Sequence, residues 1–167
     1  MQGCAESYLP RLAHNRGMVP AVILVVSFAA FRLAGLLGVA LFDNWNVPLR
    51  AALFLMFLVT ASAHWGRGRP DLVRMVPTGF PAASVLVTVT GVLEILGAIG
   101  LLIPATSRIA ACCLAILLIA LFPANVRAAR EGLTIMGRRA MSVPARGALQ
   151  LLFLGALVAV VLSSPPQ

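Results

Sequence analysis

The sequence predicts an all-α fold, a polytopic membrane helix bundle with five transmembrane helices. Hydrophobic residues make up 60% of the 167-residue chain and charged residues only 11%, and its mean hydropathy is +0.98. A soluble domain of this size cannot bury so much apolar surface, so lipid must cover it. The apolar residues gather in five stretches, and arginines lie in the connections at alternate ends, which is typical of a chain that crosses a bilayer repeatedly.

The predicted organisation has three parts: a cytoplasmic N-terminal segment over 1–18, a transmembrane bundle over 19–163, and an outer C-terminal tail over 164–167. The spans are expected at about 19–42, 48–65, 81–103, 109–125 and 147–162. Two or three of them approach the ~20 apolar residues that a bilayer core requires, and the others are close once tilt is allowed.

Proline, glycine and aromatic residues mark the ends of the first two spans. Pro20 suits the opening turn of the first helix. Residues 43–46 form a short outer turn in which Trp45 is an interfacial anchor. The second helix is expected to begin near Pro48 and to end at His64 and Trp65.

Proline and glycine also mark the ends of the remaining helices. Pro70 follows a glycine-rich break, so 70–76 is expected to form two short helical turns. Pro104 ends the third helix, which holds several small residues suited to close packing in lipid. The fourth helix is expected to run on to Glu131, which would pair with Arg127 one turn earlier, and Gly132 suits its C-terminal cap.

The charge distribution predicts the orientation of the bundle. The net charge is +8, and all thirteen basic residues are arginine. One side of the bundle would carry Arg11, Arg16, Arg67, Arg69, Arg74, Arg127, Arg130, Arg138, Arg139 and Arg146, whereas the other would carry Arg50 and Arg108. Because basic residues favour the cytoplasmic side, the N terminus is expected inside and the C terminus outside. The expected partners are the bilayer and anionic lipids at the basic face, not nucleic acid.

A cleaved signal peptide is the competing interpretation of the first span. Arg11 and Arg16 would form its basic region, and residues 38–40 are a weak small-residue cleavage site. The length of the stretch and Arg32 inside it argue against cleavage, and the orientation of the other four helices would be the same in either case.

Two ionisable residues, Arg32 and Glu94, lie within apolar spans. Counted from the inner ends of their helices, both are about 20 Å deep, so they are expected at one height. A lone charge there costs ~2.5–3.5 kcal/mol, and an ion pair would offset much of that cost. The alternatives are a polar site for a ligand head group, a proton or a quinone, and a protonated Glu94 that bonds to Thr90 instead.

A second group of polar residues is expected at the cytoplasmic end of the bundle. His64 ends the second helix, Asn125 of the fourth helix could reach it, and several arginines crowd the same surface: Arg67, Arg69, Arg74, Arg127 and Arg130. These residues form either a polar layer that satisfies helix ends or the mouth of a cavity where His64 handles protons or contacts a quinone carbonyl. No cluster has the spacing of a metal site, and haem ligation would need His14, in an irregular segment, as the second histidine.

Three segments together resemble the DoxX-like family of small bacterial integral membrane proteins. They are Ala-His-Trp at 63–65 followed by Leu-Val-Arg-Met-Val-Pro at 72–77, the glutamate-bearing Thr-Gly to Ile-Pro stretch at 90–104, and Phe-Pro-Ala-Asn-Val at 122–126. The resemblance covers about 49–162, the family's four-helix core. The helix with Arg32 is then an addition to that core, and His64–Trp65 departs mildly from the family's commoner His-Phe.

The resemblance implies an accessory or quinone-binding subunit of a membrane redox system in the bacterial cytoplasmic membrane. The family's candidate polar positions correspond to His64, Glu94 and Asn125, with a quinone as the candidate cofactor. Redox subunits or further copies of the chain are the implied partners. Whether the chain is an enzyme, and which residues would be catalytic, stays open. A non-enzymatic assembly or scaffold protein is the alternative, and a small transporter is a third.

Overall fold

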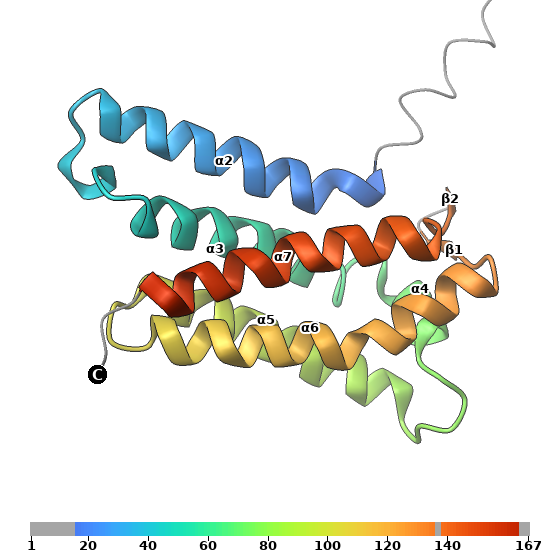
Figure 1. Cartoon of the computed structure of the whole chain (residues 1–167). Helices are drawn as coiled ribbons and strands as arrows, with labels where there is room; N and C mark the ends of the chain where they lie inside the picture. The colour runs from blue at the N-terminus through green and yellow to red at the C-terminus, as the bar shows by residue number, and fades with distance from the viewer. Residues whose placement is uncertain (1–15, 136–137, 164–167) are drawn as a thin grey trace, which may run out of the picture.

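The computed structural model describes residues 16–135 and 138–163, and the regular secondary structure of this part is helical apart from one short hairpin (Figure 1). Its α-helices are α2 (Val19–Leu36), α3 (Asn46–Ser62), α4 (Arg69–Met75), α5 (Ala83–Leu102), α6 (Ser107–Arg130) and α7 (Val143–Ser163). Two 3-10 turns, η1 (Arg16–Met18) and η2 (Ala40–Phe42), flank α2. The strands β1 (Thr134–Ile135) and β2 (Arg138–Arg139) pair antiparallel. The predicted all-α class is confirmed.

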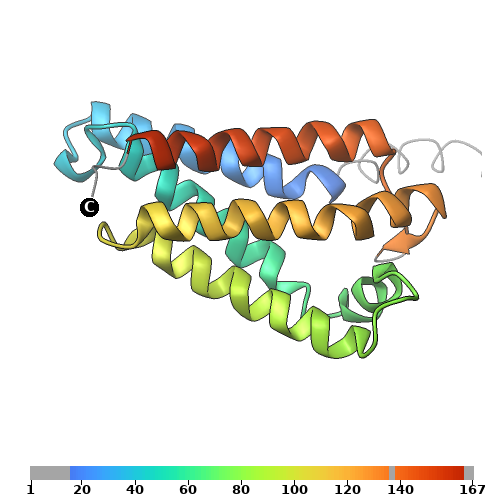
Figure 2. The ribbon, with the colours of Figure 1, turned by 60° about the horizontal axis from the view of Figure 1, so that its bottom comes forward.

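Five long helices run alongside one another, and α4 lies across one end (Figures 1 and 2). Each neighbouring pair in the order α3, α5, α6 and α7 is in contact, and α7 returns to contact α3. These four helices therefore form a closed ring in which α3 and α6 occupy opposite corners. Helix α2 packs mainly on α3, outside the ring.

The hydrophobic core lies between the helices of this ring. Its largest fully buried side chains include Leu53, Met56 and Phe57 of α3, which meet Leu114 of α6 and Leu157 of α7. The short helix α3 thus supplies more of the largest buried side chains than any other helix, whereas the long helices leave many apolar side chains on the outer surface, where lipid would cover them.

Helices α2 and α5 are shorter than the predicted spans 19–42 and 81–103, and α3 begins two residues before the predicted span 48–65 and ends three residues before its end. Helix α2 ends at Leu36 because Gly38 has φ +102°, a left-handed conformation that favours glycine, and η2 follows separately. Helix α3 ends at Ser62, so His64 and Trp65 lie in the turn beyond it. Helix α5 begins only at Ala83, after Ala82 at φ +55°.

The end of α6 confirms the prediction for that region. Arg127 Nε lies 2.8 Å from Glu131 Oε1, and Gly132 has φ +61°. The Leu133 N–H bonds to the Ala128 carbonyl, which completes a glycine-based helix cap. The hairpin that follows was not predicted, since two-residue strands leave almost no periodic signal.

Candidate functional site

The most buried acidic side chain of the described part belongs to Glu94, near the middle of α5. It is 7% exposed and faces α3. The Thr60 hydroxyl of α3 donates a hydrogen bond to Glu94 Oε1, and His64 Nδ1 lies 3.7 Å from Glu94 Oε2. The structure therefore brings together two residues singled out in the sequence, His64 and Glu94, and adds Thr60 between them.

Thr60 can satisfy Glu94 in either protonation state. Its single hydroxyl proton has two acceptors in reach, Glu94 Oε1 and the Phe57 carbonyl at 3.0 Å. An ionised Glu94 would accept that proton, whereas a protonated Glu94 would donate to the Thr60 oxygen while Thr60 donates to Phe57. Thr60 can thus stay hydrogen-bonded to Glu94 in either protonation state of the carboxyl group.

His64 is held in the turn just beyond α3. Its Nδ1 lies 3.2 Å from the Ala61 carbonyl, and burial lowers the pKa of the imidazole. The imidazole and Trp65 pack on α5 at Gly91, where a methyl group would come within 2.7 Å of His64 Cγ. Since a neutral imidazole that donates from Nδ1 accepts at Nε2, His64 can pass or accept one proton at this position.

Arg69 fixes this turn to the start of α5. Its Nη1 donates to the His64 carbonyl at 2.8 Å, and its Nη2 donates to Ser84 Oγ at 3.0 Å and to Thr88 Oγ1 at 2.9 Å. Arg69 is therefore a positioning residue for His64. The sequence indicated only a basic surface here, because hydrogen bonds between helix ends depend on which ends meet.

The predicted Arg32–Glu94 ion pair is wrong. Arg32 Nη1 instead donates to the carbonyls of Phe42 and Asp43, at 2.9 and 2.7 Å, and so closes the connection after α2. The two residues lie on opposite sides of α3, because α2 packs outside the ring and α5 packs on the other flank of α3. Equal depth along two helices does not make them neighbours.

Thr90 and Asn125 also have partners other than those expected. The Thr90 hydroxyl donates to the Leu86 and Val87 carbonyls of its own helix, at 3.0 and 3.1 Å. Asn125 Oδ1 accepts a hydrogen bond from Arg146 Nη1 of α7. Asn125 lies on α6, at the opposite corner of the ring from α3, so no hydrogen bond connects it with His64 in the described part.

The arginine-rich end of the bundle contains α4, the hairpin and the start of α2 (Figure 1). The opposite end contains the α2–α3 connection and the end of α7. Arg74 pairs with Asp71, and Arg127 pairs with Glu131 and donates to the Val76 carbonyl. Within the described residues, the exposed side chains of Arg67 and Arg130 make no hydrogen bond or ion pair. Arg11, the side chains of Arg16, Arg138 and Arg139, and the tail 164–167 lie outside the described residues.

Arg50 is the main polar residue that sequence reasoning missed. It was assigned to the sparsely charged side, yet it is only 8% exposed. Its Nε donates to the Leu101 carbonyl and its Nη2 to the Leu102 carbonyl at 2.8 Å. Arg50 therefore caps the C-terminal end of α5, where carbonyls lack helical partners. Its position four residues into an apolar helix was the available signal.

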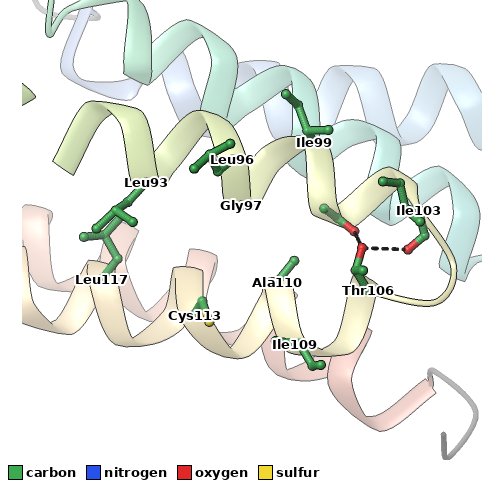
Figure 3. Close-up of a pocket in the computed structure, with 11 residues that line it drawn as sticks. Leu93, Leu96, Gly97, Ile99, Ile103, Thr106, Ile109, Ala110, Cys113 and Leu117 are labelled. Carbon is green, nitrogen blue, oxygen red and sulfur yellow. Dashed lines mark hydrogen bonds between the residues drawn. The ribbon is translucent and has the colours of Figure 1, made fainter. Parts of the chain in front are cut away.

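An apolar groove of about 460 Å³ runs between α5 and α6 on the outer surface of this helix pair (Figure 3). Its walls include Leu93, Leu96, Ile103 and Cys113. The Thr106 hydroxyl also lines the groove, but it already donates a hydrogen bond to the Gly100 carbonyl at 2.9 Å. Such a surface fits a lipid-like hydrocarbon chain and offers it little hydrogen bonding. Glu94 is not among the lining residues, because it projects from α5 toward α3.

Four described helices, α2, α5, α6 and α7, are long and apolar enough to cross a bilayer. The chain is therefore a multi-pass integral membrane protein. Residues 53–163, more than half of the chain, match the model of a family described as a domain of unknown function, DUF8561, and the chain belongs to that family. The match is not to the DoxX-like family. No curated protein and no solved structure matches the chain.

Proposed function

We propose that this protein is an accessory subunit of a membrane redox system that binds a quinone or a similar lipid-like molecule. The observation that carries the proposal is the buried cluster of Glu94, Thr60 and His64 inside a largely apolar bundle. A buried carboxyl group beside an imidazole is costly in this setting and is typical of proton-handling sites in membrane proteins.

The chemistry of a quinone fits these side chains. Reduction to the quinol takes two electrons and two protons, and the electrons would come from a cofactor of a partner subunit. A quinone carbonyl accepts hydrogen bonds, so its ligands must be donors: a protonated Glu94 would donate by turning its proton from Thr60 to the quinone, and His64 would donate from Nε2 only as the imidazolium or the other tautomer. The α5–α6 groove offers an apolar surface for a hydrocarbon tail on the same helix, while Glu94 itself projects from α5 toward α3.

The proposal includes five membrane crossings, a DoxX-like four-helix core and an additional first helix. Helix α3 has 17 residues and is about 26 Å long. This length nearly spans a bilayer core of ~30 Å, and the residues that flank the helix would cover the remaining distance at the interfaces. It leads from the far end of α2 back to the start of α5 (Figure 1), which supports a fifth crossing. The arginine distribution supports a cytoplasmic N terminus.

The orientation is tested by thiol labelling of intact cells. The background variant has Cys4, Cys112 and Cys113 replaced by alanine. A single cysteine at Asn44 should react with a thiol reagent added outside the cells. A single cysteine at Arg69 should react only after the cells are permeabilised. Labelling of both positions from the same side would refute a crossing by α3, and labelling of Arg69 alone from outside would reverse the orientation.

Ligand binding is tested by mass spectrometry of the quinones and lipids retained by gently purified protein. Wild type and Glu131→Gln, which removes an exposed carboxylate, should retain a quinone, and Glu94→Gln should lose it. Thermal unfolding of each variant checks that the fold is intact. If no quinone is retained by folded wild type, or if folded Glu94→Gln retains it equally, the redox-linked site is rejected.

A non-enzymatic assembly or scaffold protein is the second candidate function. The apolar α5–α6 groove favours it, because another membrane helix could pack there as well as a hydrocarbon chain can. Co-purification of a stoichiometric membrane partner without any quinone, unaffected by Glu94→Gln, would support this alternative.

A further inference from the structure

A second cavity, of about 530 Å³, opens at the arginine-rich end, between the first turn of α2 and the turn that follows α3. Val19 and Pro20 of α2 and Val59 of α3 form its apolar wall, and Ser62 and Arg67 lie on its polar side. The cavity therefore spans the transition from apolar helices to the polar connection, which is the depth at which lipid head groups lie.

Of the described residues that line this cavity, Arg67 is the one with a charged side chain. Its exposed guanidinium makes no hydrogen bond or ion pair with any described residue, whereas Arg69, Arg74 and Arg127 are all engaged by neighbouring groups. Among the described residues, none that lines the cavity is acidic. Two described acidic residues at this end, Asp71 of α4 and Glu131 just beyond α6, pair with other arginines.

A ligand that complements this cavity needs an anionic group for Arg67 and hydrocarbon for the valine wall. An anionic phospholipid provides both in one molecule. A zwitterionic phospholipid has the same phosphate but brings a cationic group next to Arg67, which weakens the attraction. We propose that this cavity binds an anionic phospholipid, with Arg67 on its phosphate and Val19 and Val59 against the upper acyl chain.

The test is a native mass spectrometry titration of the full chain in detergent with phosphatidylglycerol and with phosphatidylcholine of identical acyl chains. Wild type should prefer phosphatidylglycerol, and Arg67→Gln should weaken that binding about fivefold, the effect of one arginine at a lipid surface. Arg67→Lys should retain most of the preference, because it keeps the charge.

The matched control is Arg130→Gln, which removes another exposed arginine that has no hydrogen bond or ion pair with a described residue, at the same end of the bundle but outside the cavity. It should leave the preference unchanged. An equal loss in both variants would show diffuse surface attraction and overturn the proposal, as would equal binding of both lipids by wild type. Glycerol phosphate, which lacks acyl chains, should not compete at matched concentrations, and full competition would assign the site to a free anion.

Discussion

Helices α2 and α3 follow one another in the chain, are similar in length and are both apolar, yet they occupy opposite environments. In α2 the side chains of Val25, Val26 and Leu36 are 56%, 61% and 75% exposed. In α3 Leu53 and Phe57 are at most 1% exposed. The longer and more uniformly apolar of the two helices is the peripheral one.

This difference shows what apolarity means when lipid is the solvent. Exposed valines on α2 cost nothing in a bilayer, so burial is decided by helix packing rather than by hydrophobicity. The polar residues follow the same division. Helix α3 and its adjoining turn hold Arg50, Thr60 and His64, each bonded to a neighbouring helix or its own turn, whereas Arg32 of α2 bonds only to the connection after its own helix.

The largest expected effect contrasts the two helices directly. Phe57→Ala should lower the free energy of unfolding by about 3–5 kcal/mol, because it opens a cavity in the close-packed ring. Val26→Ala should change it by less than about 0.5 kcal/mol, since the side chain packs on little protein. Denaturant titration in detergent micelles measures both, and similar losses would mean that α2 is as central as α3.

A smaller effect is expected for the two arginines at the sparsely charged end. Arg50→Gln should destabilise the protein by about 2 kcal/mol, because two carbonyls at the end of α5 lose a charged donor in a buried place. Arg32→Gln should cost about 1 kcal/mol or less, since water can reach the carbonyls of the α2–α3 connection. A larger loss for Arg32 in the same micelle titration would refute this ranking.

The smallest expected effect concerns the packing of His64 on α5. Gly91→Ala should cost about 1–2 kcal/mol, because its methyl group would overlap His64 and Trp65. Gly155→Ala in α7 is the matched control, as a methyl group there meets nothing within 4 Å. Thermal unfolding compares the two, and an unchanged Gly91→Ala variant would show that the turn is free to move away from α5.

The sequence predicted where the helices lie in the chain better than it predicted which helices and side chains contact one another. The correct predictions depend on residues close together in the chain: the five apolar stretches, the break after Trp65, the Arg127–Glu131 pair and the role of Gly132. The structure has helices in all five stretches. Arg32 and Asn125 were assigned the wrong neighbours, because depth along a helix can be counted from the sequence but rotation about its axis and order around the ring cannot. Thr60 became prominent only when α5 was placed beside α3.

Hydrophobicity, arginine placement and turn residues by themselves determined that this protein is a multi-pass helical membrane protein with one strongly basic end. These properties are local, because each reflects the transfer of a short segment between water and lipid. Only the tertiary structure decided that α3 is the central helix, that Glu94 meets Thr60 and His64 rather than Arg32, and that Arg50 caps α5. Those outcomes depend on which helix faces pack together, and lipid-covered apolar surfaces do not encode that choice in their composition.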